Sequence, residues 1–364
     1  MRICFISTGK FTHINAYVDY FTQAKHDVHL ITLSPGPERD IPTYNVGLGK
    51  KYSATEGKWK YMLSMWPARK LIKKIRPDIV HTHYATSGGL TGWFCGFHPT
   101  IVTAHGSDVI CSMQSPVWRR LLKLIFNHAD CINPVSKDLA EMVRTLGISS
   151  EKIKMQTLGI DTDLFAFVPK KEKFKKRPLK LVSTRRLELV YNHPNIIEAL
   201  AIIHERGIDF RMTFVGSGDL LDELKAHASR KGIADHLRFL GRVDNNTLPS
   251  ILQEHDIYLS SSFWDGTSLS LLEAMSVGVF PVVSHIKANS AWLKHGVDGM
   301  LHKPDDPGDL ANCIISVSEA PEFMDQAIPR NRERVVELGS RKRNMEKLES
   351  IYQELITDGN EKNT

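Results

Sequence analysis

The sequence predicts an α/β protein with two domains, each a parallel sheet covered by helices on both faces. The first reason is length, because 364 residues exceed the roughly 250–300 residues at which a single hydrophobic core stops growing. The second is that short β-branched runs alternate with helical patterns, as in chains that form parallel sheets. The third is that this alternation stops midway along the chain and then starts afresh.

Strands and helices alternate in the same way in both halves. In the first half we predict strands at Arg2–Ser7, Val28–Thr32, Ile79–Thr82, Thr100–Thr103 and Cys131–Pro134, and helices at His13–Ala24, Trp59–Ile75, Pro116–Asn127 and Lys137–Leu146. In the second half we predict strands at Leu179–Ser183, Arg211–Val215, Leu237–Leu240, Ile257–Ser260 and Val279–Ser284, and helices at Pro194–Arg206, Leu220–Lys231, Thr247–Glu254 and Leu269–Val277. One long helix, Arg330–Ile356, should follow near the end.

Composition indicates the domain boundaries. Residues 1–165 should form the N-terminal domain and residues 179–340 the C-terminal one. Between them, residues 166–178 carry six lysines and arginines, two prolines and no apolar period, which is typical of a linker. The helical residues 341–357 should pack back toward the N-terminal domain, and the polar residues 358–364 should be a disordered tail.

The overall composition is that of a globular cytoplasmic protein. Apolar residues make up 42% and charged residues 24%, which are ordinary values. No run of about 18 apolar residues predicts a transmembrane span, and the first residues are better read as a buried strand than as a signal peptide. The five cysteines lie far apart, as expected of reduced thiols. The net charge of +6 favours anionic partners, although no recognition motif predicts nucleic acid.

The most informative segment is Ser260–Met275, where a predicted strand ends in small polar residues and a helix follows. Ligands of parallel sheets bind outside the carboxyl ends of the strands, and two domains that face each other would line one cleft with these ends. Thr267 or Ser268 can cap the helix, whose N–H groups and dipole attract anions. Gly266 would let a ligand approach the backbone closely.

Two acids frame this segment. Asp265 should lie at the mouth of the turn, and Glu273 lies eight residues later, inside the helix. With a diphosphate on the helix N-terminus, both carboxylates would remain available for ligand hydroxyls. The alternative is a capped helix with one surface acid and one buried acid. For Asp265 alone the two interpretations are equally open, whereas the whole pattern favours a ligand site.

The segment resembles the donor site of retaining glycosyltransferase family 4, in which seven residues separate two acids and a Glu-Ala-Met-x-x-Gly-x-Pro-Val-Val run follows. Here that run is Glu273–Val283, with one extra residue at Phe280. Gly296–Leu301 and Pro304–Pro307 also match, so the resemblance covers nearly the whole chain. It implies the GT-B fold, in which two facing Rossmann-like domains with parallel sheets enclose an interdomain cleft.

The resemblance also assigns roles within this segment. Glu273 would bind the ribose hydroxyls of the donor. Asp265 would contact hydroxyls of the donor sugar, at a position where the family usually has a glutamate. The phosphates and the sugar would face the backbone of Gly266, Thr267, Ser268 and Leu269.

Two arginines follow the first strand of the second half. Arg185 and Arg186 have planar guanidinium groups that suit a diphosphate. The family places an arginine here and a lysine five or six residues later, where this chain has Tyr191 and Asn192. We therefore expect Arg186 to offset most of the leaving-group charge. Arg185 either assists it as a donor-binding residue or forms a solvated pair with it.

Other site residues come from the same resemblance. Gly216 would lie near the base or ribose, although a plain strand–helix turn would also explain it. His105 would hydrogen-bond a donor-sugar hydroxyl, and Asp108 could hold its imidazole in one tautomer; the alternative is a histidine satisfied by the backbone. Gly9 ends the first strand, where the family has a glycine-rich loop.

The resemblance implies a retaining hexosyltransferase that uses a UDP- or GDP-sugar and a glycan or glycolipid acceptor, as in surface polysaccharide biosynthesis. The sugar nucleotide is a co-substrate, and no cofactor or metal is expected. His81 and His83 alternate on a strand but have no third ligand nearby in sequence. The alternatives are a nucleotide-sugar epimerase on the same fold and a non-catalytic nucleotide-sugar-binding protein.

Basic clusters within residues 69–76 and 119–123 raise one further hypothesis. A basic amphipathic helix can lie on an anionic membrane, so the protein could contact the inner face of the membrane peripherally. A helix packed on its own sheet would explain the same pattern. The sequence does not indicate an oligomeric state.

Overall fold

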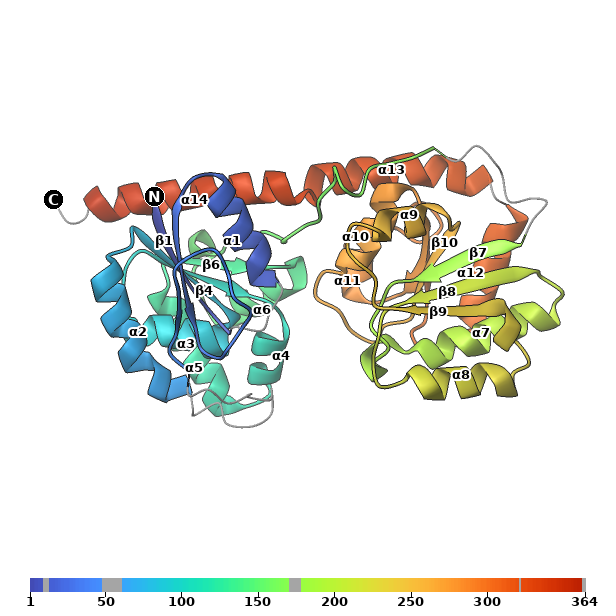
Figure 1. Ribbon diagram of the computed structural model, residues 1–364, viewed down its shortest axis with the longest axis horizontal. Coiled ribbons are helices and arrows are strands. Elements are labelled where there is room, and N and C mark those ends of the chain that lie inside the picture. The colour runs from blue at the N-terminus through green and yellow to red at the C-terminus, as the bar shows by residue number, and fades with distance from the viewer. Residues whose placement is uncertain (9–12, 48–60, 170–177, 321, 362–364) are drawn as a thin grey trace. The chain divides into compact units, whose positions relative to one another are not determined.

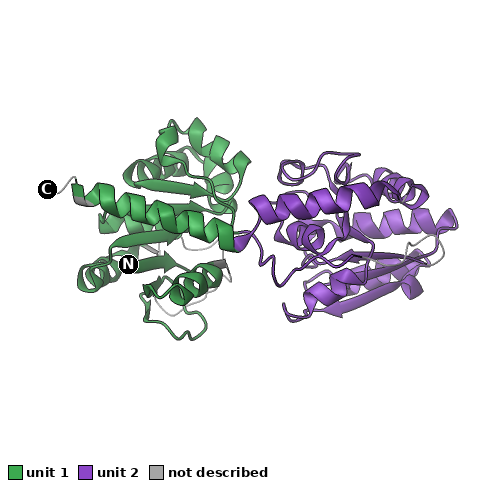
Figure 2. Cartoon of the chain, turned by 90° about the horizontal axis from the view of Figure 1, so that it is seen from above, with its two compact units in different colours: residues 1–158, 342–364 green, residues 159–341 purple. Residues whose placement is uncertain are grey.

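The computed structural model describes residues 1–8, 13–47, 61–169, 178–320 and 322–361. The chain forms two compact units, which Figures 1 and 2 show. Unit 1 comprises residues 1–158 and 342–364, and unit 2 comprises residues 159–341. Each unit contains one six-stranded sheet.

Unit 1 has the strand order β3-β2-β1-β4-β5-β6, with every pair parallel. Its strands are β1 (Arg2–Ser7), β2 (Asp27–Thr32), β3 (Thr43–Asn45), β4 (Ile79–His83), β5 (Thr100–Ala104) and β6 (Cys131–Pro134). Its helices are α1 (His13–Gln23), α2 (Tyr61–Ile75), α3 (Leu90–Cys95), α4 (Ser107–Met113), α5 (Pro116–His128), α6 (Lys137–Thr145) and α14 (Arg341–Glu361), which begins at the last residue of unit 2; a π-helical turn spans Tyr84–Gly89 and a 3-10 turn Ser150–Lys152.

Unit 2 has the order β12-β11-β10-β7-β8-β9, which repeats the order of unit 1 when its strands are counted from β7. Its strands are β7 (Leu179–Ser183), β8 (Phe210–Val215), β9 (Leu237–Gly241), β10 (Ile257–Ser260), β11 (Phe280–Ser284) and β12 (Met300–His302). Its helices are α7 (His193–Glu205), α8 (Leu221–Arg230), α9 (Leu248–Gln253), α10 (Leu269–Val277), α11 (Lys287–Ser290), α12 (Pro307–Glu319) and α13 (Glu322–Leu338), with 3-10 turns at Leu189–Tyr191 and Ala234–His236.

The core explains why these sheets are covered on both faces. Successive side chains of a strand point to opposite faces. Leu181 and Val182, neighbours in β7, accordingly belong to different hydrophobic clusters: Leu181 packs with α7, α8 and α12, and Val182 with α9 and α10. Both residues are completely buried. The predicted class, two α/β domains with parallel sheets and helices on both faces, is confirmed.

The single long helix predicted over residues 330–356 is wrong. Helix α13 ends at Leu338 and α14 begins at Arg341. Between them Ser340 pairs with Ile160 as in a parallel sheet, because the Ile160 N–H donates to Gly339 O and the Arg341 N–H donates to Ile160 O, each at 2.8 Å. A segment paired in this way cannot continue a helix. The sequence prediction also missed the short elements β3, α3, α4, α11 and β12, and helix α12.

The unit boundaries differ from the predicted ones. Unit 1 ends at Leu158, before the expected residue 165, because Phe165 is buried in the core of unit 2. Its carbonyl accepts hydrogen bonds from Ser276 Oγ at 2.6 Å and Arg332 Nη1 at 2.9 Å. The chain therefore passes between the units before the predicted linker 166–178, of which residues 170–177 lie outside the described part.

The end of the chain belongs to unit 1. Tyr352 of α14 is completely buried and stacks on Phe21 with ring centroids 4.9 Å apart. The disordered tail predicted from residue 358 is wrong for residues 358–361, which continue α14. Gly359 lies against Pro99, so the last turn of the helix packs on the start of β5.

Candidate functional site

The site in unit 2 lies where its strand order reverses. Strands β7 and β10 pair side by side, with Leu181 opposite Ile257, and β8 and β11 flank them on either side. In open parallel sheets such a reversal leaves a crevice at the carboxyl ends of the two strands. The chain leaves these ends through residues 184–188 and 261–268, so both segments selected from the sequence meet at this place.

Arg185 connects the two segments. Its side chain is only 8% exposed, and its Nη2 atom lies 2.5 Å from Asp265 Oδ2. Its Nη1 atom donates to Ser268 Oγ at 3.0 Å and Ser270 Oγ at 3.3 Å. Burial lowers the pKa of Arg185, but Asp265 outweighs that effect and holds the pKa above its ordinary value. A guanidinium group therefore lies, fully charged, at the amino end of α10.

Helix α10 has the bounds that the sequence predicted. Ser268 is its N-cap, and Ser268 Oγ accepts the Leu271 N–H at 3.3 Å. Gly278 ends the helix at a φ of 91°, a left-handed conformation that favours glycine. A cap satisfies one of the first N–H groups, and the others stay available to an anion. The Gly266 N–H donates to Asp265 Oδ1 at 2.8 Å, which fixes that carboxylate at the turn.

Glu273 lies in the second turn of α10, where its carboxyl group is largely enclosed by protein. Burial raises the pKa of Glu273 to about 7, while the guanidinium groups of Arg341 and Arg185 act in the opposite direction. A ligand that donates hydrogen bonds to this carboxylate would favour its ionised form.

Arg186 and Arg185 lie in different environments. The Arg186 side chain is 70% exposed, and its Nη2 atom lies 2.7 Å from Glu188 Oε1. The sequence favoured Arg186 as the site residue and left Arg185 open, whereas the structure places Arg185 against α10. Sequence reasoning did not identify two neighbours of that guanidinium, Ser270 and the ring of Tyr191, whose centroid lies 4.2 Å from Arg185 Cζ.

Gly216 supports this arrangement from β8. Its φ is 140°, and a Cβ atom on it would lie 2.6 Å from the Arg185 carbonyl oxygen. A Cβ atom on Gly218 would lie 2.2 Å from the Leu187 carbonyl oxygen. Both glycines let the loop after β8 pack directly on the loop that carries Arg185. Contact of Gly216 with a base or ribose stays a prediction.

The corresponding place in unit 1 is lined by histidines. His83 ends β4, His105 follows β5, and His83 Nδ1 lies 3.1 Å from His105 Nε2. Tyr84 stacks on the His105 ring with centroids 4.3 Å apart. Asp108 accepts backbone N–H groups of Ala85, Gly106 and His105 at 2.7–3.2 Å and so fixes the backbone of this loop. A bond from Asp108 to the imidazole stays a prediction. Gly9 lies outside the described residues.

His81 is a buried neutral group. It hydrogen-bonds the Tyr352 hydroxyl and, at 2.6 Å, the Thr103 hydroxyl. Burial, assisted by His105, lowers the pKa of His81 to about 3. Within the part of the chain that the structure describes, no group of three or more potential metal ligands is found.

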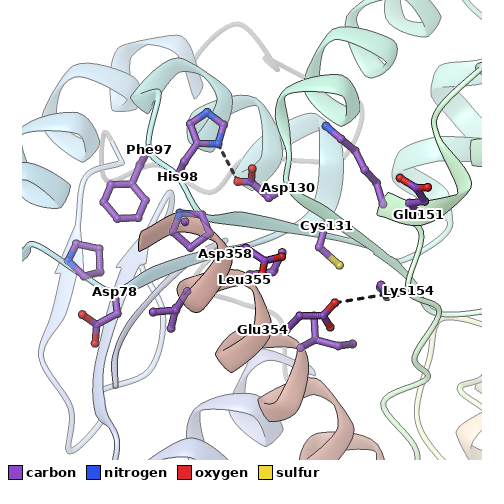
Figure 3. A pocket seen from close by; sticks show the side chains of 16 residues that line it. Asp78, Phe97, His98, Asp130, Cys131, Glu151, Lys154, Glu354, Leu355 and Asp358 are labelled. Carbon is purple, nitrogen blue, oxygen red and sulfur yellow. Dashed lines mark hydrogen bonds and ion pairs between the residues drawn. The ribbon is translucent and has the colours of Figure 1, made fainter. Parts of the chain in front are cut away.

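A cavity of about 930 Å³ lies at the opposite edge of the unit 1 sheet, beside α14 (Figure 3). In it His98 bonds Asp130 at 2.8 Å, and Lys154 lies 4.0 Å from Glu354. This edge holds the amino ends of β4, β5 and β6, whereas ligands of such sheets bind at the carboxyl ends. The geometry therefore favours the Arg185 site for a nucleotide.

Comparison with known families accounts for most of the chain. Residues 165–334 match the family described as "Glycosyl transferases group 1". Residues 8–164 match the family described as "Glycosyltransferase Family 4". The two matches follow the two units closely, although both meet inside the segment 159–165 that packs in unit 2.

Individual relatives agree with these families. The chain is 26% identical over 332 residues, 80% of each chain, to the UDP-Gal:alpha-D-GlcNAc-diphosphoundecaprenol alpha-1,3-galactosyltransferase of Escherichia coli. It is 26% identical over 341 residues, 90% of this chain and 85% of the relative, to the phosphatidyl-myo-inositol mannosyltransferase of Mycolicibacterium smegmatis.

Solved structures share the fold. Sucrose-phosphate synthase from Thermosynechococcus elongatus has a TM-score of 0.82 at 17% identity, over 98% of this chain and 99% of that one. HepE from Anabaena, solved in complex with UDP, has a TM-score of 0.78 at 16% identity, over 98% of this chain and 100% of that one. Together with the two family matches, these likenesses show that the chain is a glycosyltransferase with the GT-B fold and belongs to family 4.

Proposed function

We propose that the protein transfers a sugar, with retention of configuration, from a UDP- or GDP-sugar to a glycan or lipid-linked acceptor. The observation that carries this proposal is the enclosed guanidinium group of Arg185 at the amino end of α10, beside the reversal of strand order. A cation and a helix N-terminus together fit a diphosphate. The two acids that flank the turn, Asp265 and Glu273, fit the hydroxyl groups on either side of that diphosphate.

The proposed chemistry needs stabilisation of a departing diphosphate. Its negative charge grows as the glycosidic bond breaks, and the N–H groups of α10 would stabilise it without reorganisation. Arg186 would add a second charge, which requires its side chain to leave Glu188. Glu273 would accept from the ribose hydroxyls, and Asp265 from a sugar hydroxyl. No step in this scheme uses a metal.

In unit 1, we assign His105 a hydrogen bond to a donor-sugar hydroxyl. Its ring is already fixed, because His83 bonds one nitrogen and Tyr84 stacks on one face. An imidazole nitrogen held in a set direction can donate to, or accept from, one hydroxyl group. Such a group distinguishes sugar hydroxyls better than it binds phosphate.

The relatives' substrates support the acceptor class. The Escherichia coli relative acts on a diphosphoundecaprenol-linked sugar and the mycolicibacterial one on phosphatidyl-myo-inositol, as their names state. An amylovoran biosynthesis glycosyltransferase of Erwinia amylovora is also similar, at 24% identity over 68% of this chain. We therefore propose a lipid-linked or polysaccharide acceptor in surface-glycan synthesis, at the cytoplasmic side of the membrane.

Two experiments test this function: a binding screen that identifies the donor, and an analysis of the reaction product. Thermal shift against UDP-, GDP-, ADP- and dTDP-sugars should single out a uridine or guanosine donor. Incubation of that donor with lipid-linked acceptors should give a product whose new anomeric centre, read by NMR, keeps the donor's configuration. Inversion would refute the retaining mechanism. An epimerised donor in the absence of acceptor would refute transfer as the main activity.

We also propose peripheral contact with an anionic membrane through α2 and α5, which both pack on α3. Met62, Leu63 and Trp66 of α2 are 53–63% exposed, and α5 exposes Val117 and Leu124. Basic residues of both helices accompany these apolar side chains, a combination that suits a bilayer surface. No helix in the described part of the chain is both long and apolar enough to cross a bilayer.

Vesicle co-sedimentation tests this contact. The protein should bind vesicles that contain about 30% phosphatidylglycerol more strongly than neutral vesicles, because basic side chains are attracted to anionic lipids. The double change Leu63→Ser and Trp66→Ser should weaken binding, whereas Leu338→Ser in unit 2 should not. Equal binding by all three proteins, or none by the unchanged protein, would refute the contact.

A further inference from the structure

The guanidinium group of Arg185 is incompletely bonded. It carries five N–H donors, and its two Nη atoms bond Asp265, Ser268 and Ser270. Its Nε–H is buried and has no acceptor among the described residues. An unsatisfied donor on a buried charged group is costly, and an oxygen of an anionic ligand would satisfy it.

We propose that Arg185, stacked on Tyr191, supplies the buried positive charge that binds the donor's diphosphate, in place of the lysine that this chain lacks. The inference rests on the proposed function and adds a specific diphosphate-binding residue to it. Two features of the structure support it: how the guanidinium is held, and how it is connected to both ends of the donor site.

Tyr191 holds the guanidinium by its ring. Arg185 Cζ lies 4.2 Å from the ring centroid, a distance at which a guanidinium is attracted by the aromatic face. The loop that carries Tyr191 is itself fixed, because the Phe263 N–H donates to Val190 O at 3.0 Å. Asn192, at a φ of 47°, bonds Pro304 O at 2.8 Å. At the position where the family has a lysine, this chain therefore has the flat apolar face of the Tyr191 ring. The positive charge comes instead from Arg185, in the neighbouring loop.

Arg185 also connects the sugar-binding acid with the phosphate-binding helix. Its Nη2 atom bonds Asp265, and its Nη1 atom bonds the cap residue Ser268. Because Nε is a separate donor, a phosphate oxygen can bind there while the ion pair with Asp265 persists. Arg185 and the Gly266 N–H hold the two oxygens of Asp265 between them, so Arg185 contributes both charge and geometry to the site.

Calorimetric binding to the full chain tests this role, with UDP and GDP compared with uridine and guanosine. Arg185→Ala should weaken binding of the preferred diphosphate about 100-fold, since a charge-assisted bond is lost, and change binding of the matching nucleoside less than threefold. Tyr191→Phe should behave like the unchanged protein, whereas Tyr191→Leu should weaken diphosphate binding about fivefold. Tyr191→Lys in the Arg185→Ala background should restore at least tenfold.

The outcomes separate this inference from the function on which it rests. Unchanged diphosphate affinity in Arg185→Ala, equal losses for nucleoside and diphosphate, or equal affinities of Tyr191→Phe and Tyr191→Leu would overturn the role of Arg185 alone. Absence of binding of either diphosphate to the unchanged protein would overturn the proposed function as well. The Tyr191 pair keeps the test valid if Arg185→Ala does not fold, because neither change removes a buried charge.

Discussion

Units 1 and 2 share one strand order. Where that order reverses, however, unit 2 has charged side chains and unit 1 has imidazole rings. In unit 2 the place is charged: Arg185 and Asp265 form an ion pair at a helix N-terminus. In unit 1 the same place holds stacked imidazoles, of which His81 is neutral because burial lowers its pKa to about 3. Topology fixes where a ligand can bind, and the side chains decide which part of it is bound.

The two places differ because a buried guanidinium and a buried imidazole need different polar partners. A buried guanidinium needs a carboxylate, and Asp265 supplies it. The amino end of α10 and the Arg185 Nε–H, which has no acceptor among the described residues, remain for an anion. Buried histidines need only hydroxyl and imidazole partners, and Thr103 and Tyr352 supply them to His81. Under the proposed function, the place in unit 2 would bind the phosphates and the place in unit 1 the uncharged hydroxyls.

The largest expected effect comes from the charged place. Arg186→Ala should lower turnover at least 100-fold, which corresponds to about 2.7 kcal/mol of transition-state stabilisation, because the departing diphosphate loses a cation. Steady-state kinetics with the identified donor measures it. Glu188→Gln is the control, since it releases Arg186 from its ion pair without removing its charge. Turnover like that of the unchanged protein in Arg186→Ala would refute its role.

The second effect concerns Asp108, the buried acid of unit 1 that accepts backbone N–H groups. Asp108→Ala should lower the free energy of unfolding by about 2–3 kcal/mol, because three backbone N–H groups lose their acceptor. Urea unfolding measures it, with the exposed Asp138→Ala as a control expected within about 0.5 kcal/mol. If the two variants unfold alike, Asp108 does not hold the loop that carries His105.

The third effect separates the two binding places directly. His105→Ala should lower kcat/KM for the sugar nucleotide about tenfold, or about 1.4 kcal/mol, and leave the Kd of the nucleoside diphosphate unchanged. Kinetics and calorimetry together measure it. A parallel loss of diphosphate affinity would contradict the division of the ligand between charged and neutral places.

The fourth effect, similar in size to the third, is a dependence of stability on pH. The pKa of Glu273 is raised to about 7, so the folded state binds more protons than the unfolded state between its ordinary value of 4.5 and 7. The resulting stability is present below pH 4.5 and is lost as the pH rises through 7. Glu273→Gln should therefore be more stable than the unchanged protein by about 1–2 kcal/mol at pH 8. At pH 4.5 the two should unfold alike, and a constant difference at both pH values would refute the shift.

The sequence predicted what local chemistry determines. The bounds of β10 and α10 were correct, because Ser268 and Gly278 mark the helix ends in the sequence itself. The buried position of the Arg185 side chain, by contrast, depends on contacts with Gly216 and Tyr191, which only the folded chain brings next to it. The break between α13 and α14 depends on pairing of Ser340 with Ile160, 180 residues apart in sequence, and no local pattern contains that information. The role of Gly9 and the predicted catalytic and donor-binding roles remain predictions.

Because α14 completes unit 1, the order in which the chain is synthesised cannot be the order in which it folds. Phe21 and His81 precede unit 2 in the chain, yet their stacking and hydrogen-bonding partner, Tyr352, is translated only after the whole of unit 2. Unit 2 is contiguous and can become compact on the ribosome as soon as residue 341 has emerged. Residues 1–158 must therefore wait for α14. A nascent or truncated chain ending near residue 158 should expose that apolar surface and bind chaperones.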